Sequence, residues 1–188
     1  MAEVKKEESD AQPSFGWAFL KRLPLRLPNL QAHLIFWPLM IVGFTLDLAS
    51  KRAVFEWLEQ QPYNSVSVID GFLRLVKAQN PGAAFGIAAG EHYLLITVSV
   101  IAVVIIFTVF LLGRTKGKLM YIALGLFGAG ICGNLYDRIF NDGLVRDFID
   151  VYYNRYHWPA FNLADSMLCV GVGLMSISIL WFSKRPYG

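Results

Sequence analysis

Apolar residues along this chain gather in four long segments, and the polar residues lie mostly between them. The clearest segment, Tyr93 to Leu112, contains no charged residue. A helix that crosses the roughly 30 Å hydrocarbon layer of a bilayer needs about 20 apolar residues, so this segment predicts a membrane-spanning helix. Two further segments predict spans in the same way: Leu119 to Tyr136 and Ser166 to Ser183.

A fourth segment, Leu34 to Phe55, begins as an apolar run but carries charges toward its end: Asp47, Lys51 and Arg52. We predict a span here too, because a long apolar run precedes the first charge and long side chains near a helix end reach the interface. Pro38 is expected in the first turn or so, where proline is tolerated. Because the first ten residues are polar, we expect this segment to stay as a helix and not to be cleaved as a signal.

Basic residues are distributed unevenly over the connections between these segments. Ten lie on the side that holds both termini and the 113–118 link, and five lie in the other two connections, leaving aside Lys51 and Arg52 at a helix end. The positive-inside rule therefore predicts that both termini are cytoplasmic. The chain then divides into a flexible or interfacial cytoplasmic extension (1–32), a four-helix membrane domain (33–184) and a cytoplasmic tail (185–188).

Composition supports a membrane protein and argues against other classes. The chain is 55% hydrophobic and 16% charged, whereas soluble domains carry roughly 25% charged residues. Its net charge of +3 is not gathered on one face with aromatic residues, so we expect no nucleic-acid partner. Cys132 and Cys169 lie in apolar segments and no His, Asp and Glu cluster has metal-ligand spacing, so we expect neither a metal nor another cofactor.

The two connections on the side away from the termini, 56–92 and 138–160, carry a different pattern. Residues 66–80 (VSVIDGFLRLVKAQN) alternate and are β-branched, which predicts short strands. Five aromatic residues suit a belt at the outer membrane interface: Trp57, Tyr152, Tyr153, Tyr156 and Trp158.

Ionisable residues inside or beside the spans are candidates for function, because charge is costly in hydrocarbon. Asp47 and Lys51 share a helix face; they form either a self-neutralising pair near the interface or a pair that faces a polar cavity in the bundle. Asp137 and Arg138 fit snorkelling toward the interface, whereas Asn134, one turn deeper, predicts a hydrogen bond across the bundle.

Two aspartates near one membrane surface form the candidate catalytic pair. Alone, Asp147 in the 138–160 loop fits a solvated surface residue, and Asp165, three residues after Asn162, fits a helix cap. Residues 148–164 form a return long enough to bring the two carboxylates together, where both cannot easily ionise. Such a pair supplies a base that activates water and an acid that polarises a carbonyl.

Four sequence blocks resemble the signatures of lipoprotein signal peptidases (signal peptidase II). They are GNLYDRIFNDGLVRDFID (133–150), PAFNLADS (159–166), NPGAAFGI (80–87), and Asp47 with Lys51 on the first helix. The blocks occur in the family's order and cover residues 34–183.

The resemblance implies an all-α membrane fold of four transmembrane helices, with a small extracytoplasmic β element and a short loop helix over the site. It implies a catalytic dyad of Asp147 and Asp165 in the bacterial inner membrane, near its extracytoplasmic surface. The family's substrates are prolipoproteins whose cysteine carries diacylglycerol; the cut falls before that cysteine, and globomycin inhibits it. Further positions match those thought to line the substrate cleft (Asn80, Gly82, Gly130, Asn134, Arg138 and Asn162) or to support it (Asp47, Lys51 and Asp137).

The expected partners are therefore prolipoproteins, membrane lipid and globomycin-type inhibitors, and the glycines of the 119–136 segment are expected to leave a gap for the acyl chains. The alternative is a small ion- or proton-coupled transporter. A carrier places ionisable groups along a path at the midplane, often with repeat symmetry. Here they gather at one surface without an internal repeat. A third reading is a non-catalytic assembly factor.

Overall fold

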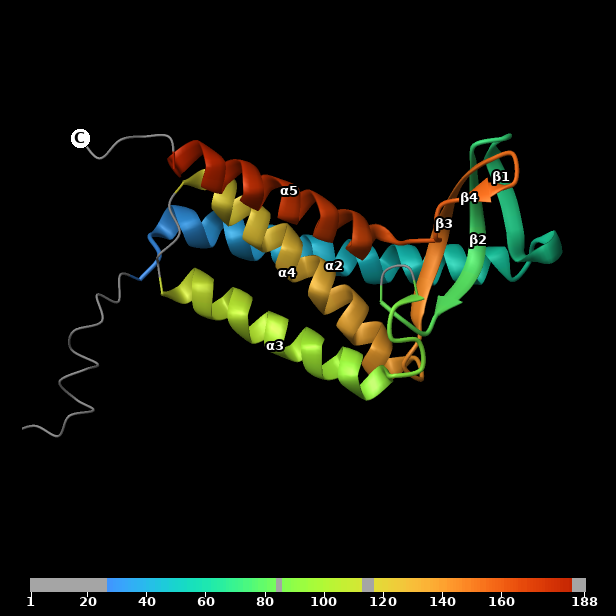
Figure 1. The fold of residues 1–188 in the computed structure, drawn as a ribbon, viewed down its shortest axis with the longest axis horizontal. Helices are drawn as coiled ribbons and strands as arrows, with labels where there is room; N and C mark the ends of the chain where they lie inside the picture. Colours follow the sequence, from blue (N-terminus) through green and yellow to red (C-terminus); the bar gives the residue numbers. More distant parts are fainter. Residues whose placement is uncertain (1–26, 84–85, 113–116, 184–188) are drawn as a thin grey trace, which may run out of the picture.

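The computed structural model describes residues 27–83, 86–112 and 117–183 (Figure 1). Most of the predicted N-terminal extension and the whole predicted tail, 185–188, lie outside these ranges. Within them, four helices are long and apolar enough to cross a membrane. They are α2 (Leu30–Leu58), α3 (His92–Leu111), α4 (Lys118–Phe140) and α5 (Leu163–Ser183). Each coincides closely with a predicted span, so the four-helix prediction is confirmed.

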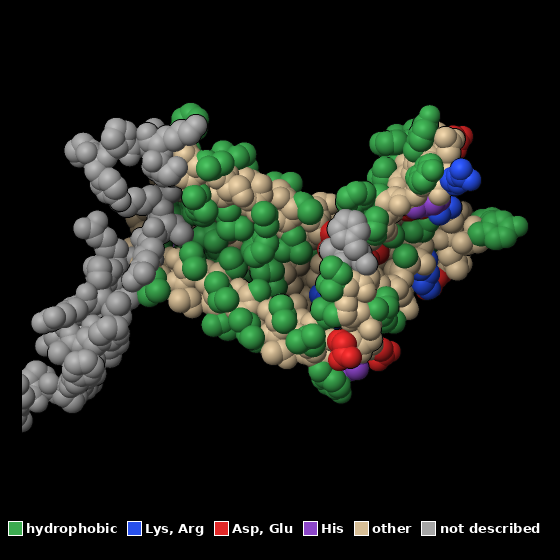
Figure 2. All heavy atoms as spheres, viewed as in Figure 1, with side chains coloured by type: hydrophobic (Ala, Val, Ile, Leu, Met, Phe, Trp, Pro, Cys, Tyr) green, Lys and Arg blue, Asp and Glu red, His purple; other side chains and the backbone are tan. Residues whose placement is uncertain are grey.

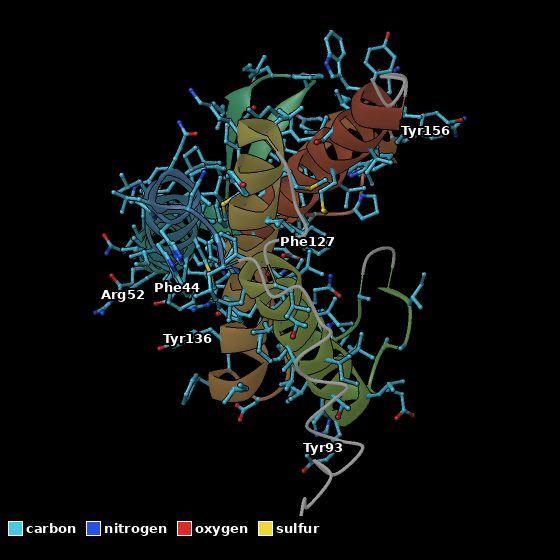
Figure 3. All side chains as sticks on the ribbon, turned by 90° about the vertical axis from the view of Figure 1, so that its left-hand side faces the viewer. Phe44, Arg52, Tyr93, Phe127, Tyr136 and Tyr156 are labelled. Atoms are coloured by element: carbon cyan, nitrogen blue, oxygen red, sulfur yellow. The ribbon has the colours of Figure 1, made fainter. Side chains whose placement is uncertain are left out.

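Helix α4 is the centre of the bundle. It packs against α2, α3 and α5, whereas the contacts of α3 with the other helices are fewer. Figure 3 looks along the bundle and shows α2, α3 and α5 arranged around α4, with α3 and α5 diverging on one side. Every helix thus reaches its neighbours mainly through α4, and side chains on α4 can contact all parts of the bundle.

Helix α2 begins earlier than predicted. The Asn29 side chain accepts a hydrogen bond from the Ala32 amide at 2.9 Å and caps the helix, which then starts at Leu30. Pro38 consequently lies in the helix interior, and its predicted place in the first turn is wrong. The polar residue His33 lies inside the helix, where its Nδ1 atom accepts a hydrogen bond from Trp37 Nε1 at 3.0 Å.

Glycines on α4 let the helices approach closely. A Cβ atom added at Gly125 would lie 3.0 Å from the Phe36 carbonyl oxygen of α2, and one at Gly130 would lie 2.6 Å from the Ala164 carbonyl oxygen of α5. A side chain at Gly130 would clash with α5 backbone and one at Gly125 would require α2 to shift; small residues at helix contacts are typical of membrane bundles. The prediction of an acyl-chain gap at these glycines is therefore wrong, because α2 and α5 fill the space.

An antiparallel sheet stands at one end of the bundle. It contains β1 (Ser65–Ile69), β2 (Leu73–Asn80), β3 (Val145–Tyr153) and β4 (Tyr156–His157), in that order, and the one-turn 3-10 helix η1 (Pro62–Asn64) precedes β1. The strands predicted at 66–80 are confirmed. The predicted short helix over the site stays a prediction, because residues 84–85 of the 81–91 connection lie outside the described ranges.

Strand β3 corrects one expectation. Asp147 was predicted in a loop, but it lies in β3 opposite Ala78 of β2. The strand is not evident from the sequence VRDFID, because the adjacent residues Asp147 and Phe148 are both buried and the usual alternation of buried and exposed positions is broken. Figure 1 shows the strands running across the helix axes at the end of the bundle, while α2 continues past the sheet.

Candidate active site

The first turn of α5 holds Asp165 in place. The Asp165 amide donates to Asn162 Oδ1 at 2.9 Å, and the Asn162 amide donates to Asp165 Oδ2 at 3.1 Å. This reciprocal pair is a capping box, in which each side chain satisfies an amide that the helix start leaves free. The predicted cap is confirmed, and it leaves Asp165 Oδ1 available for other partners.

Asp147 is buried against two side-chain amides. Only 1% of its surface is exposed. Asn162 Nδ2 donates to Asp147 Oδ1 at 2.7 Å, and Asn80 Nδ2 at the end of β2 donates to Asp147 Oδ2 at 3.1 Å. Asn162 therefore contacts both aspartates, one with its side-chain amide nitrogen and the other with its carbonyl oxygen and backbone amide. The expectation of a solvated Asp147 is wrong.

Asn134 joins the two aspartates to the centre of the bundle. Its Nδ2 donates to Asp165 Oδ1 at 2.8 Å, and its Oδ1 accepts from Asn162 Nδ2 at 3.1 Å and from Lys51 Nζ at 3.0 Å. The predicted hydrogen bond of Asn134 across the bundle is confirmed. Residues from α2, α4, β3 and α5 thus meet in one network around Asp147 and Asp165.

The surroundings of Asp147 favour its protonated form. Burial raises the pKa of the Asp147 carboxyl from 3.8 to about 7, and the negative charge of Asp165 adds to the rise. The hydrogen bonds from Asn80 and Asn162 and the positive charge of Lys51 act in the opposite direction. Asp147 therefore holds a proton below about pH 7.

Lys51 is the cation at the base of this network. It is wholly buried, and its Nζ atom lies 2.8 Å from Asp47 Oδ2 and 3.2 Å from Asp137 Oδ2, in addition to its bond with Asn134. Asp47 Oδ1 accepts from the Ala164 amide of α5 at 2.8 Å. The pair Asp47 and Lys51 therefore faces the interior of the bundle, and the alternative of a pair at the interface is wrong.

Asp137 and Arg138 are buried as well, so their interpretation as snorkelling residues is wrong. Arg138 Nη2 donates to the Gly82 carbonyl oxygen at 3.0 Å, and Arg138 Nη1 donates to the carbonyl oxygen of Asn134, one turn earlier in α4, at 3.5 Å. The Gly82 amide in turn donates to Asn80 Oδ1 at 2.9 Å. The beginning of the 81–91 connection is thus tied to the residues that bind Asp147.

Arg146 was not identified from the sequence as a site residue. Its backbone amide donates to Asp137 Oδ2 at 3.0 Å and its Nε donates to Asp137 Oδ1 at 3.1 Å, so one carboxylate holds both ends of this residue. Because Arg146 directly precedes Asp147, Asp137 positions the strand that carries the candidate acid. The one signal in the sequence was the adjacency of a basic residue to Asp147.

Gly130, another predicted site residue, lies on α4 one turn before Asn134. It packs against Ala164 and Leu168 of α5, and its predicted contact with substrate stays a prediction. In the described parts of the chain, no group of three or more His, Cys, Asp and Glu residues is placed to hold a metal ion.

One face of the molecule is apolar and hollowed. Figure 2 shows hydrophobic side chains gathered over α3, α4 and α5, with acidic and basic side chains visible in the hollow next to the 81–91 connection. In Figure 3, Phe127 of α4 lies on the side that faces the space between α3 and α5. A lipid-facing surface therefore leads toward the polar end of the bundle.

Comparison with known families shows a match over most of the chain. Residues 39–181 match the model of a family described as Signal peptidase (SPase) II. A lipoprotein signal peptidase of Geobacter sulfurreducens is 40% identical over 154 residues, covering 80% of this chain and 94% of that protein. One of Syntrophus aciditrophicus is 42% identical over 134 residues, covering 69% of this chain and 80% of that protein.

Solved structures show the same fold. A bacterial membrane enzyme determined at 2.3 Å by the in meso method has a TM-score of 0.69 and 29% identity, covering 80% of this chain and 91% of that one. A second bacterial membrane enzyme, determined at 1.9 Å, has a TM-score of 0.65 and 28% identity, covering 83% of this chain and 97% of that one.

Proposed function

The chain belongs to the signal peptidase (SPase) II family, and from this premise we propose that it is an aspartic endopeptidase with Asp147 and Asp165 as its catalytic pair. Its substrates are diacylglyceryl-modified prolipoproteins, and the cut falls before the lipidated cysteine. The observation that carries this proposal is the pair itself: two carboxylates from β3 and α5 share the amide of Asn162. The transporter alternative does not fit a peptidase family.

The two aspartates divide the work between a base and an acid. Asp165, as the carboxylate, takes a proton from a water molecule while the water oxygen attacks the scissile carbonyl carbon. Asp147, which is partly protonated at neutral pH because its pKa is about 7, gives its proton to the carbonyl oxygen, which forms a neutral gem-diol. When the intermediate collapses, the proton held by Asp165 goes to the leaving nitrogen, and a hydroxyl proton of the diol returns to Asp147.

Neighbouring donors orient the peptide. Arg138 is buried beside the pair, and its Nε atom has no hydrogen-bond partner among the described residues. Its guanidinium instead holds the Gly82 carbonyl oxygen at the start of the 81–91 connection. Asn80 holds Asp147 with its amide nitrogen and the 81–91 connection with its oxygen. The 81–91 connection therefore contributes to the cleft in which the peptide lies.

The position of the pair in the bundle fits a lipid-anchored substrate. Asp165 lies in the first turn of a span, so the scissile bond is held at the membrane surface. The apolar hollow beside α3, α4 and α5 accommodates the acyl chains (Figure 2). The excess of basic residues on the side of the termini supports the proposal that this end of the bundle lies on the extracytoplasmic side of the bacterial inner membrane.

The test is hydrolysis of a diacylated precursor by the purified protein in bilayers. Asp147→Asn or Asp165→Asn removes one proton-transfer group and lowers the rate by about 10⁴-fold, at the upper end for general acid–base groups. Asp142→Asn is the matched control, because Asp142 is exposed and its positive φ of 50° suits asparagine. Globomycin inhibits the wild-type protein and the control alike. Full activity in either dyad variant refutes the proposal.

A further inference from the structure

The end of the sheet nearest the β1–β2 and β3–β4 turns carries a cluster of exposed apolar side chains, which we term the tip patch. Tyr153 and Tyr156 are 72% and 70% exposed. Around them lies an open pocket of about 300 Å³ that includes Val151, Tyr152 and His157 in its lining. The patch consists of Ile69, Phe72, Tyr153, Tyr156 and Trp158.

The tip patch is held close to the membrane surface by chain length alone. The apolar part of α5 spans 19 residues, which is about 28 Å of helix and close to the hydrocarbon thickness of about 30 Å. Leu163 therefore lies near the boundary of the hydrocarbon. Trp158 precedes Leu163 by five residues, so even a fully extended chain places it within about 18 Å of that boundary.

The direction of the sheet keeps the patch at that level. In Figure 1 the strands run across the helix axes, and the turns of the sheet project sideways beyond the start of α5. Figure 3 places Tyr156 at the periphery of the molecule, beyond α5. The tip patch thus lies to the side of the bundle, over the region that lipid occupies, and beyond the start of α5 along the helix axes.

Hydrogen bonds join the two turns into one unit. The Tyr152 amide donates to the Phe72 carbonyl oxygen at 2.8 Å, and the Gly71 amide donates to the Tyr152 hydroxyl oxygen at 3.1 Å. On the same sheet face as Tyr152, Asp150 forms an ion pair with Arg74 and a hydrogen bond with His157 Nδ1. The backbone that carries the exposed aromatic side chains is therefore held in place by these bonds, and their exposure is not the result of a loose hairpin.

The chemistry of the patch fits phospholipid headgroups better than a protein partner. Tyrosine and tryptophan combine an apolar ring with a polar group and concentrate at membrane interfaces. Arg155 adds a cation 5.9 Å from the centre of the Tyr156 ring, which suits a phosphate. Of the nearby acidic side chains, Asp150 is buried, and the exposed Asp70 of the β1–β2 turn accepts a hydrogen bond from Ser67 Oγ.

We propose that the tip patch is an interfacial anchor, which inserts into the phospholipid headgroup layer of the leaflet where α5 begins. The open pocket takes the glycerol region of a phospholipid, and Arg155 pairs with its phosphate. Since the same strand β3 carries Asp147, the anchor fixes the height of that residue over the bilayer. The inference rests on the four spans and the sheet, and it stands independently of the proposed catalytic function.

The test is the membrane depth of a spin label at position 156. The protein is reconstituted in bilayers of phosphatidylethanolamine and phosphatidylglycerol, with Cys132 and Cys169 replaced by alanine and Tyr156→Cys labelled. Collision with oxygen and with a water-soluble nickel complex reports depth. References are Tyr63→Cys, 98% exposed and at the opposite end of β1, and Val170→Cys, exposed on α5.

The label at 156 is expected between the two references, at headgroup depth, and the same aqueous accessibility as at 63 overturns the proposal. A protein occupant also predicts that aqueous result in bilayers of lipid alone. A second label at Phe72→Cys is then measured in a chain with Tyr153→Ser and Tyr156→Ser. It is expected to move toward the aqueous value, whereas Tyr63→Ser leaves it unchanged. An unchanged depth in the double variant also overturns the proposal.

Discussion

The two ends of the helix bundle are packed by opposite means. At the end away from the sheet, aromatic rings of α2 and α3 meet: Phe36 stacks on Phe110 with ring centroids 4.0 Å apart, and Trp37 stacks on Phe107 at 5.6 Å. At the end near the sheet, α2 and α4 meet through ions and amides centred on Lys51. One end is packed by apolar rings, and the other end brings charged residues together.

The difference shows how the same helices serve stability at one end and chemistry at the other. Rings tolerate small displacements because dispersion attraction has little directionality. Buried ions lose most of their stabilisation when a partner moves or disappears, because their desolvation is then uncompensated. Displacing a group at the polar end is therefore costly, and this cost holds the end in a defined geometry. An aspartate pair requires such a geometry.

The largest contrast is expected between a cation removed from the polar end and a ring removed from the apolar end. Lys51→Met leaves Asp47 and Asp137 without their shared cation, so we expect a loss of about 3–5 kcal/mol in unfolding free energy together with loss of hydrolysis. Phe110→Ala costs a similar 3–5 kcal/mol or so, but the folded fraction keeps its kcat. Denaturant unfolding in detergent and hydrolysis at low temperature measure the two quantities.

A compensating variant sharpens that contrast. When Asp47→Asn is added to Lys51→Met, one charge of each sign is removed and Asp137 keeps its ion pair with Arg146; replacing a whole buried ion pair is often close to neutral for stability. We expect stability to recover while hydrolysis stays low. Wild-type stability in Lys51→Met alone would contradict a buried ion cluster.

A smaller effect separates two glycines of α4. A Cβ atom at Gly133 would overlap Asp47 Oδ2, whereas one at Gly128 would lie 3.6 Å from its nearest neighbours, Ile106 and Met40. Gly133→Ala is therefore expected to cost about 1–3 kcal/mol from overpacking and to slow hydrolysis. Gly128→Ala is expected to stay within about 0.5 kcal/mol of the wild type. Equal effects in thermal unfolding would show that the helices are farther apart at Gly133.

The smallest expected effect concerns pH. In the proposed mechanism, activity needs protonated Asp147, so we expect activity to fall as pH rises through the Asp147 pKa of about 7. The hydrogen bond from Asn80 stabilises the Asp147 carboxylate and lowers its pKa. Asn80→Ala should therefore raise the Asp147 pKa and move the high-pH limb of kcat/KM to higher pH. A profile over pH 5–9 checks the direction; Asn141→Ala, which removes an amide bonded to the Leu144 carbonyl, should leave the limb in place.

The sequence predicted the spans because the length and polarity of a span are set by the bilayer itself. It also predicted Asp147 and Asp165 as a pair, because both had to meet at the same membrane surface. It did not show that Lys51 points inward, since its orientation depends on how α2 is rotated against α4. The bonds from Arg146 to Asp137 were missed for a similar reason: they depend on where β3 leaves α4, and sequence spacing carries no such information.

The most direct test of the account is the infrared spectrum of the wild-type protein in bilayers as a function of pH. A buried protonated carboxyl has a carbonyl band well separated from that of a carboxylate. We expect such a band at pH 6, its loss with a midpoint near pH 7, and its absence in Asp147→Asn but not in Asp142→Asn. A band that titrates near the ordinary aspartate value of 3.8, or one unaffected by Asp147→Asn, would contradict a protonated Asp147 in this pair.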